Sequence, residues 1–331
     1  MYTKEEILSQ PGEFKKVLSY LNQLPISSFP CFLIDSDVVY FVGCGSSYYL
    51  GISACKYFSR VTGIETKAIP SGELLLSDIR VMTSTKLKYS AVMISRSGNT
   101  TETVLAAEKL NKIGIKTFGI TLDGKSDLQK VCSLCLTLPL EEKSVVMTKS
   151  FSCMLLSLFF ISDKISGKEP KYNQLVNNSN EFVKESCQLE ENQTLLEANH
   201  YVFLGSGIYE GIARESALKL QEMSLSMAEA FSSLEYRHGP KALVTNDIVI
   251  VLYSSGQSEK EEMNLLDEMR ELGASIICRS PIAEDGRDAF IQIIFAQLLG
   301  LFIAKRKGLN PDQPRNLSKT VILNHSFKKN T

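Results

Sequence analysis

Short, mainly apolar runs alternate with longer amphipathic stretches through the first half of the chain. The runs at Val38–Val42, Ala91–Ser95 and Thr117–Thr121 are typical of strands buried on both faces of a sheet. Weaker strands are predicted at Glu65–Ile69 and around Leu134–Leu138, and helices at Glu5–Leu24, Tyr49–Arg60, Ser71–Ser77, Thr101–Ile113 and Lys149–Ile165. This alternation predicts an α/β fold in which helices cover a parallel sheet.

The second half repeats this plan. Tyr201–Gly207 parallels Tyr40–Gly45, and the two Gly-x-Gly turns lie 162 positions apart. Ile248–Ser258 likewise parallels Val92–Thr100, with the matching glycines separated by 158 positions. Two pairs at nearly the same offset indicate an internal duplication. We therefore predict two tandem doubly wound parallel-sheet domains of the flavodoxin-like type.

The length also favours two domains, because 331 residues exceed what one hydrophobic core usually supports. We predict a first domain over residues 1–167 and a second over residues 181–331. The polar stretch Lys168–Asn180 is the predicted linker. In the second copy, the charge run Glu259–Glu262 predicts a solvated helix face rather than a phosphate site.

Nothing in the composition indicates a nucleic-acid or membrane partner. The formal net charge is −1, and the contents of 44% hydrophobic and 22% charged residues are ordinary for a soluble globular protein. The longest apolar run, Cys153–Ile161, is too short to cross a bilayer, and Met1–Ile7 lacks the apolar core of a signal peptide. We expect a cytoplasmic protein.

The eight cysteines are scattered and match no zinc-binding spacing, so we expect no metal site. Cys132 and Cys135 have the spacing of a redox motif. They lie in an alternating run that a strand would bury, which favours structural thiols over a redox pair.

The clearest candidate for ligand binding is the hydroxyl-rich turn Ser95-Arg96-Ser97-Gly98-Asn99-Thr100, between a predicted strand and a predicted helix. Backbone N–H groups and the positive end of the helix dipole favour an anion there. The turn lacks the Gly-Lys-Ser/Thr ending of a nucleotide P-loop, so a monophosphate is expected. Taken alone, Asn99 and Glu102 also fit a capping box that binds no ligand.

A second serine pair follows the first strand. Gly43-Cys-Gly-Ser46-Ser47-Tyr48 is a partial dinucleotide fingerprint, but Tyr48 stands where the third glycine belongs. We expect Ser46 and Ser47 to offer hydroxyl groups to a sugar or a phosphate, because ligands of such sheets bind at the carboxyl ends of strands.

Candidate acid–base residues lie in the second half. Glu215, Lys219 and Glu222 share one helical face, an arrangement that an exposed salt-bridge ladder also explains. His238 precedes a Gly-Pro pair in a predicted loop, whereas His200 and His325 have no predicted role. The tail around Lys319 would ordinarily fray, or it could fold back and bring this lysine into a pocket.

Six motifs in order make the chain resemble the tandem sugar isomerase (SIS) domain family. They are Cys44–Ser47, Ser95–Thr100, Met147–Phe151, Glu215–Glu222, Glu235–Pro240 and Pro314–Lys319. The chain is similar to the isomerase half of glucosamine-6-phosphate synthase and to stand-alone glucosamine-6-phosphate deaminases and phosphosugar isomerases.

The resemblance implies roles for matching residues. The phosphosugar would be bound by Ser47, Ser95, Ser97 and Thr100, with the backbone of Arg96 and Val146. Glu222 would carry a proton between C1 and C2, Lys219 would support the carboxylates, and Lys319 would engage the open-chain carbonyl. His238 would assist ring opening from the other subunit of a homodimer.

The resemblance also predicts the reaction. We expect glucosamine 6-phosphate to become fructose 6-phosphate and ammonia, without a cofactor or a metal, and without a glutaminase domain to supply ammonia. The alternatives are a tagatose- or fructose-phosphate isomerase, a fructosamine-phosphate deglycase and a non-catalytic phosphosugar-sensing module. Arg96, Asn99 and Met147 depart from the synthase pattern, so contacts to sugar hydroxyls are expected to differ.

Overall fold

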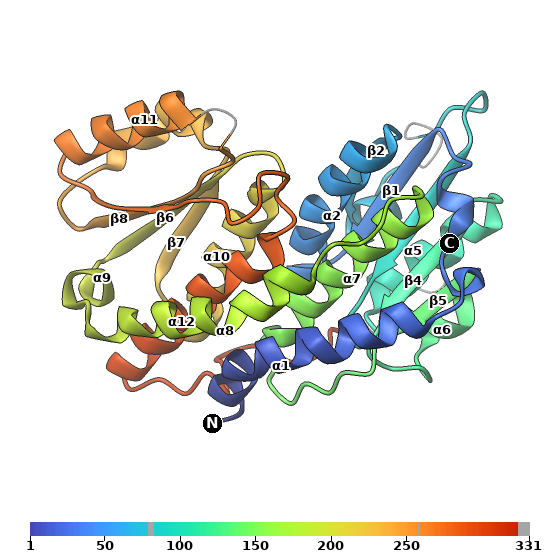
Figure 1. The fold of residues 1–331 in the computed structure, drawn as a ribbon, viewed down its shortest axis with the longest axis horizontal. Coiled ribbons are helices and arrows are strands. Elements are labelled where there is room, and N and C mark those ends of the chain that lie inside the picture. Colours follow the sequence, from blue (N-terminus) through green and yellow to red (C-terminus); the bar gives the residue numbers. More distant parts are fainter. Residues whose placement is uncertain (79–82, 257–258, 324–331) are drawn as a thin grey trace. The chain divides into compact units, whose positions relative to one another are not determined.

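The computed structural model describes residues 1–78, 83–256 and 259–323 and contains two parallel sheets (Figure 1). His325 and Ser258 lie outside the described residues. The first sheet has the order β2-β1-β3-β4-β5 and the second the order β7-β6-β8-β9. The predicted α/β fold of two doubly wound sheets is confirmed.

The strands of the first sheet are β1 (Val38–Gly43), β2 (Glu65–Pro70), β3 (Tyr89–Ile94), β4 (Lys116–Thr121) and β5 (Leu134–Thr137). The helices between them are α2 (Ser46–Thr62), α3 (Ser71–Leu76), α5 (Thr101–Lys112) and α6 (Asp127–Val131). Helices α1 (Tyr2–Gln23) and α7 (Lys149–Ile165) and the short 3-10 turns η1 (Ile26–Ser28) and η2 (Cys31–Leu33) complete the first half.

The strands of the second sheet are β6 (His200–Gly205), β7 (Met227–Phe231), β8 (Ile248–Tyr253) and β9 (Ser275–Arg279). Its helices are α8 (Asn173–Cys187), α9 (Gln193–Glu197), α10 (Tyr209–Ser224), α11 (Glu259–Glu271) and α12 (Ala289–Arg306), with 3-10 turns η3 (Gln188–Glu191), η4 (Leu234–Arg237) and η5 (Pro240–Leu243).

The internal duplication is visible in the strand register. Val38 of β1 lies opposite Tyr89 of β3, and the equivalent His200 of β6 lies opposite Ile248 of β8. In both sheets the first strand of the copy is flanked by the second and third. Strand order therefore changes direction beside β1 and beside β6, which is where sheets of this type bind ligands.

The chain forms two compact units, each assembled from three segments. The five-stranded unit comprises residues 13–141, 153–171 and 318 onward, and the four-stranded unit comprises residues 1–12, 142–152 and 172–317. The tail from Ser318 thus belongs with the first sheet. The domain boundaries predicted at 1–167 and 181–331 remain a prediction.

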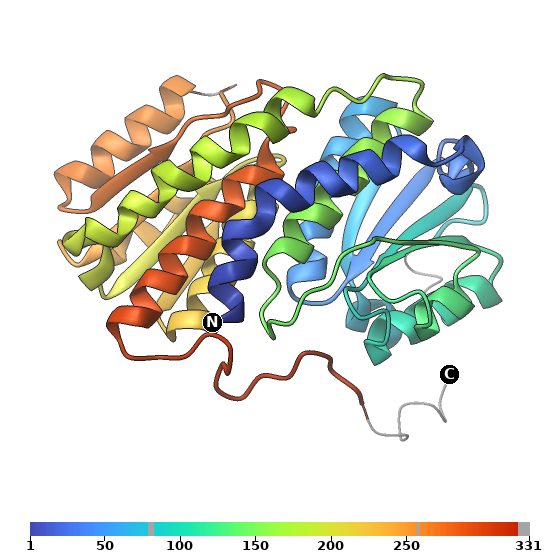
Figure 2. The ribbon, with the colours of Figure 1, turned by 60° about the horizontal axis from the view of Figure 1, so that its bottom comes forward.

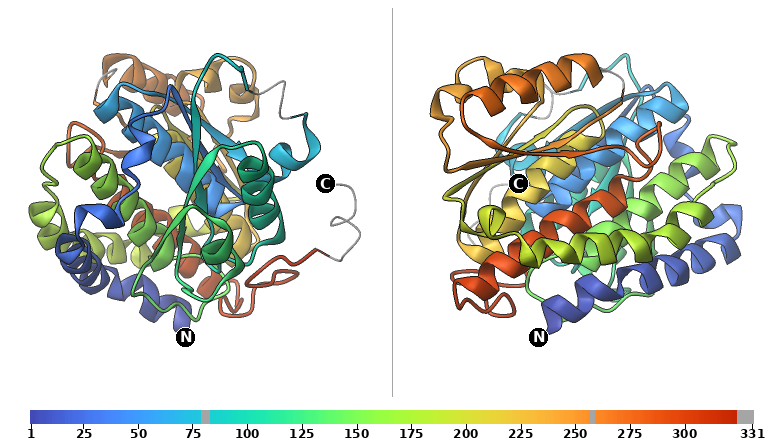
Figure 3. Two further views of the ribbon diagram at one scale, coloured as in Figure 1. Left: turned by 90° about the vertical axis from the view of Figure 1, so that its right-hand side faces the viewer. Right: turned by 60° about the vertical axis from the view of Figure 1, so that its left-hand side comes forward.

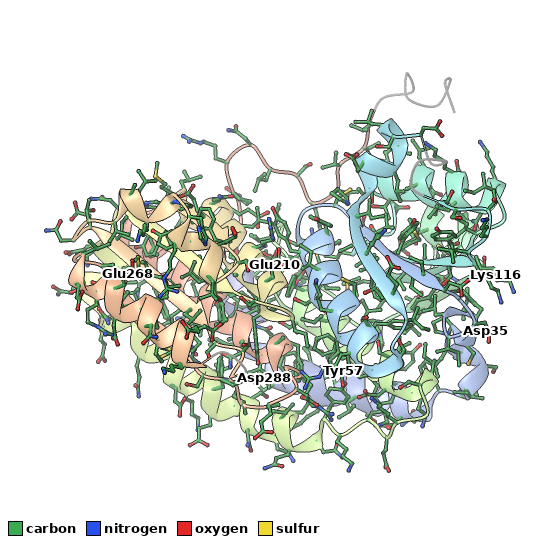
Figure 4. All side chains as sticks on the ribbon, turned by 90° about the horizontal axis from the view of Figure 1, so that it is seen from above. Asp35, Tyr57, Lys116, Glu210, Glu268 and Asp288 are labelled. Atoms are coloured by element: carbon green, nitrogen blue, oxygen red, sulfur yellow. The ribbon has the colours of Figure 1, made fainter. Side chains whose placement is uncertain are left out.

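In the five-stranded unit, alternate residues of β1 face different helices. Tyr40 and Val42 pack with Ala106 and Leu110 of α5 in one buried cluster. On the other face, the ring of Phe41 lies 5.7 Å from the ring of Phe58 on α2. Tyr57 of the same helix stacks on Phe159 of α7 and donates a hydrogen bond to Asp163 at 2.9 Å (Figure 4).

In the four-stranded unit, α11 covers one face of the sheet, and α10 and α12 cover the other (Figure 3). Val202 and Ile250 pack against Leu265 and Met269 of α11. Helix α12 is apolar and long enough to cross a membrane, but 89% of it is buried, as in the core helix of a soluble protein.

The predicted linker at Lys168–Asn180 is wrong from Asn173 onward, where α8 begins. Polar residues dominate the stretch, yet Leu175, Val176 and Ser179 are buried on one side of the helix. Figure 2 shows α8 running alongside α12. A narrow apolar stripe in a polar sequence is therefore enough to form this helix, because α12 offers a partner.

The helix that carries Glu215, Lys219 and Glu222 ends soon after Glu222. Helix α10 ends at Ser224, Leu225 adopts a left-handed conformation with φ 50°, and strand β7 begins at Met227. Glu229 therefore lies on a strand, where its carboxylate meets the imidazole Nε2 of His200 at 2.9 Å. This pair gives His200 a structural partner.

Candidate phosphosugar site

The two predicted serine-rich turns follow neighbouring parallel strands. Helix α2 begins at Ser46 directly after β1, and α5 begins at Thr101 after β3. Parallel neighbours end at the same edge of a sheet, so two helix N-termini and two sets of hydroxyl groups gather there. Ser46, Ser47 and the turn Ser95–Thr100 therefore lie at one edge of the five-stranded sheet.

Glycines permit the close packing of these turns. A Cβ on Gly43 would lie 2.7 Å from the carbonyl carbon of Ser47, so α2 could not start so close to β1. Gly98 has φ +65°, and a Cβ there would lie 2.2 Å from Ser126 Oγ. Both turns therefore require glycine for steric reasons.

Internal hydrogen bonds hold the turn after β3, residues Ser95–Thr100, which we call the phosphate loop. Ser95 Oγ accepts from the N–H of Gly98 at 3.0 Å and lies 3.1 Å from Thr100 Oγ1. Ser97 Oγ accepts from the N–H of Asn99 at 3.2 Å. The hydroxyl groups are thus fixed before any ligand arrives, which lowers the entropic cost of binding.

The capping-box alternative for this loop is wrong, because the residue that caps α5 is Thr100 rather than Asn99. The side chain of Asn99 is engaged elsewhere: its Oδ1 accepts from the N–H of Asp127 at 2.9 Å and its Nδ2 donates to the carbonyl of Ser97 at 3.1 Å. Asn99 therefore stabilises the shape of the loop itself.

The C-terminal tail lies against the phosphate loop. The guanidinium of Arg96 donates from Nη2 to the carbonyl oxygen of Lys319 at 2.9 Å. The N–H of Thr101, in the first turn of α5, donates to the carbonyl of Val321 at 3.3 Å. The fold thus brings Lys319, more than 200 positions away in sequence, to the predicted phosphate site of the five-stranded unit.

The carboxylate and lysine face of α10 is buried. Lys219 and Glu215 have fully buried side chains, and Lys219 Nζ lies 3.1 Å from Glu215 Oε1 and 2.5 Å from Glu222 Oε2. The alternative of an exposed salt-bridge ladder is therefore wrong. The side chain of Glu222 retains 18% exposure, so it is the carboxylate of this triad that a ligand can reach.

Lys219 stays charged in this environment. Burial by itself would lower its pKa, but the adjacent carboxylates of Glu215 and Glu222 outweigh that effect and raise the pKa above its ordinary value. The ammonium group of Lys219, in contact with both carboxylates, holds Glu222 in place.

His238 follows the 3-10 turn η4, and Gly239 with φ +121° comes next. Glu268 of α11 secures this segment from both sides. Its carboxylate accepts from Arg237 Nε at 2.9 Å and from Lys241 Nζ at 2.6 Å (Figure 4). The hydrogen bond from Lys241, and to a smaller extent the one from Arg237, lowers the pKa of Glu268. Sequence reasoning missed Glu268, because nothing local links it to the histidine turn.

Val146 lies in the segment before α7 and is buried. Glu142 organises this segment, accepting from the N–H of Thr148 at 3.0 Å and from the hydroxyl of Ser150 at 2.5 Å. Val146 belongs to the four-stranded unit, together with Lys219, Glu222 and His238. The other predicted site residues, Ser46, Ser47, Ser95, Arg96, Ser97, Thr100 and Lys319, belong to the five-stranded unit.

The second copy of the phosphate loop is filled by the chain itself. Glu262 of α11 is 1% exposed, and its carboxylate accepts from Ser254 Oγ at 2.7 Å and from Ser233 Oγ at 3.2 Å. The predicted solvated face is therefore wrong at this residue. The sequence does contain a signal for this burial. Glu262 precedes the buried Leu265 and Met269 by three and seven positions, which places all three on one face of the helix.

Cys132 and Cys135 are structural, as their alternating pattern predicts. Both point toward Gly119, where an added Cβ would lie 3.0 Å and 2.6 Å from their sulfur atoms. Burial raises the pKa of each thiol to about 12. Thiols with such values are poor nucleophiles at neutral pH.

The sequence model of the SIS domain matches residues 32–162 and 194–282, which together cover more than half of the chain. The first match contains β1 to β5 and the second contains β6 to β9.

The chain belongs to the SIS domain family.

Solved structures of similar length share the fold of this chain. Glucosamine-6-phosphate deaminase from Thermotoga maritima is 40% identical, with a TM-score of 0.89, and the similarity covers 98% of this chain and 100% of that one. Tagatose-6-phosphate ketose/aldose isomerase from Escherichia coli is 22% identical, with a TM-score of 0.84 over 98% of this chain and 96% of that one. At that identity the likeness shows the fold alone.

Curated relatives include longer proteins. The isomerizing glutamine–fructose-6-phosphate aminotransferase of Aquifex aeolicus is 28% identical over 343 residues, which cover 96% of this chain and 57% of that protein. The chain spans about half the length of the curated relatives it matches. Family membership supports an enzyme of the phosphosugar isomerase and deaminase kind.

Proposed function

We propose that the chain converts glucosamine 6-phosphate to fructose 6-phosphate and ammonia. The observation that carries this proposal is the full-length, 40% identical match to the glucosamine-6-phosphate deaminase of Thermotoga maritima. The chemistry of the two groups of predicted site residues supports it.

The first group anchors the phosphate in this proposal. Ser46 and Ser47 begin α2, and the phosphate loop precedes α5, so hydroxyl groups and helix N-termini converge on an anion. Arg96 and Val146 contribute backbone groups. The anchor holds the sugar without acting on the reacting carbons.

The second group moves the proton. In the open-chain substrate, Glu222 removes the proton from C2 and returns it to C1, while a second proton passes from the amino nitrogen to O1, which changes the amino aldose into a ketose imine. Water then adds to the imine carbon, and ammonia leaves to give the ketose. The step needs no redox partner. Lys219 holds the carboxylate through the 2.5 Å contact described above.

His238 and Lys319 prepare the substrate in this proposal. His238 transfers a proton during ring opening and serves the site of the other subunit in a homodimer. The amine of Lys319 engages the open-chain carbonyl, as lysines do when they form Schiff bases.

The proposal is tested by incubating purified protein with glucosamine 6-phosphate and measuring ammonia. We expect ammonia release in the wild type and a fall in kcat of about 100- to 10,000-fold in Glu222→Gln. Glu210→Gln is the matched control, because Glu210 lies on the same helix in a partly exposed pair with Arg214 (Figure 4).

A wild-type protein that releases no ammonia would contradict the proposal. If the same preparation interconverts an aldose and a ketose phosphate, the function moves to plain phosphosugar isomerisation. The same proton transfer by Glu222 serves that reaction.

A further inference from the structure

We propose that Arg96 is a positioning residue, whose side chain fastens the C-terminal tail to the phosphate loop and so sets the place of Lys319. The inference rests on the proposed function, in which Lys319 engages the substrate carbonyl. It assigns the Arg96 side chain a task separate from phosphate binding by the loop backbone.

The Arg96 side chain starts from a fixed backbone. The residue is 7% exposed, and its carbonyl oxygen accepts from the N–H of Leu122 at 3.0 Å and from Thr121 Oγ1 at 3.1 Å. From this point Nη2 reaches the carbonyl of Lys319 at 2.9 Å. Because the guanidinium is charged, this hydrogen bond is stronger than one between neutral groups.

Two further hydrogen bonds attach the tail to Thr101, the residue that directly follows the phosphate loop. The N–H of Thr101 donates to the carbonyl of Val321 at 3.3 Å, and Thr101 Oγ1 accepts from the N–H of Leu323 at 3.1 Å. Residues 319–323 are thus fastened to both sides of the loop, with Arg96 nearest the lysine. All of these groups belong to the five-stranded unit.

This arrangement couples phosphate anchoring to the position of the amine. The backbone of Lys319 is fixed to the loop that holds the phosphate, while the residue itself is exposed to solvent. Loss of the Arg96 contact would leave the phosphate anchor intact and would misplace the amine. The expected signature is a change in kcat with little change in KM.

The kinetic test compares Arg96→Gln and Arg96→Lys with the wild type on glucosamine 6-phosphate. We expect kcat to fall about 10- to 100-fold in Arg96→Gln and less in Arg96→Lys, with KM within about threefold in both. Borohydride trapping of fructose 6-phosphate on Lys319, measured by mass spectrometry, should fall in parallel. Arg60→Gln, an exposed position at the end of α2, is the control and should change none of these values.

A second test does not depend on the reaction. Trypsin should cut after Lys319 faster in Arg96→Gln than in the wild type, and Thr101→Val should give a smaller increase because it removes only the bond to Leu323. Thermal denaturation confirms that each variant is folded. The two assays can give different answers. If the wild type releases no ammonia but Arg96→Gln is still cut faster, the proposed reaction is refuted and the tail contact is supported.

Equal cleavage rates in all variants would overturn the inference. So would a rise in KM at unchanged kcat in Arg96→Gln, since that result would make the guanidinium a phosphate ligand. The effect of Arg96→Gln on kcat should also disappear in a Lys319→Ala background, because both changes act through one amine.

Discussion

Lys219 contributes to the candidate site in two ways, because its ammonium group contacts two carboxylates. Its side chain is fully buried between Glu215 and Glu222, and removing a partner from a buried ion pair costs more than the pair itself contributes. The residue therefore supports both the stability of α10 and the placement of the proposed proton carrier.

Replacing Lys219 by Met should expose this double role. Two adjacent carboxylates would lose their countercharge, so we expect the free energy of unfolding to fall by about 3–5 kcal/mol. Urea denaturation measures the loss, and ammonia release should be abolished. Arg214→Met, in a partly exposed pair on the same helix, should cost at most about 1 kcal/mol. Equal losses in the two variants would contradict the buried-triad interpretation.

At the scale of elements, α11 links the core of the four-stranded unit to the turn that carries His238. Its inner face contributes Leu265 and Met269 to the core, while Glu268 holds the turn that carries His238. One helix thus sets both the packing of the sheet and the position of a proposed acid–base residue.

Glu268→Gln should loosen the histidine turn without unfolding the sheet. We expect a fall in kcat of about 2- to 10-fold, because the imidazole is placed less accurately. Asp267→Asn, which removes the neighbouring exposed pair with Arg270, should leave kcat unchanged. Unchanged activity in Glu268→Gln would refute a positioning role.

The same ion pairs predict a pH dependence. The pKa of Glu268 is lowered from its ordinary 4.5, so its contribution to stability is present above that value and is lost as the pH falls through the lowered pKa. The difference in unfolding free energy between the wild type and Glu268→Gln should therefore be present at neutral pH and should shrink progressively as the pH falls below 4.5. Denaturant titrations at both pH values measure it.

At the scale of the whole molecule, the duplication produced two similar sheets with different strand-edge chemistry. The turn after β3 presents hydroxyl groups and the N-terminus of α5, whereas the hydroxyl of Ser254 after β8 already donates to the carboxylate of Glu262. A carboxylate offers the same kind of acceptor as a phosphate oxygen. In the second copy, the carboxylate of Glu262 therefore occupies the position that a phosphate group would take in the first.

This difference predicts one phosphosugar site for each chain. Calorimetric titration with fructose 6-phosphate should give a stoichiometry of one per chain, and Ser95→Ala should weaken binding by about tenfold, the loss of one hydrogen bond to a charged group. Glu261→Ala, at an exposed position next to Glu262, should change neither value. A stoichiometry of two would show that the second turn also binds ligand.

The sequence by itself determined most strands and helices, the duplication and the position of the hydroxyl-rich turn between β3 and α5. Strands and helices follow from apolar periodicity, which each segment carries locally, and parallel topology then brings the turns after β1 and β3 to one edge. The linker error at α8 arose because a narrow buried stripe in a polar segment needs a partner, α12, to become recognisable.

Only the tertiary structure decided which charges are buried and which distant segments meet. The contact of Arg96 with Lys319, the hold of Glu268 on the histidine turn and the capture of Glu262 by Ser254 join residues from different elements. A charged residue in a sequence looks the same whether it faces solvent or a partner. Burial and pairing are properties of the packed fold, and the site depends on both.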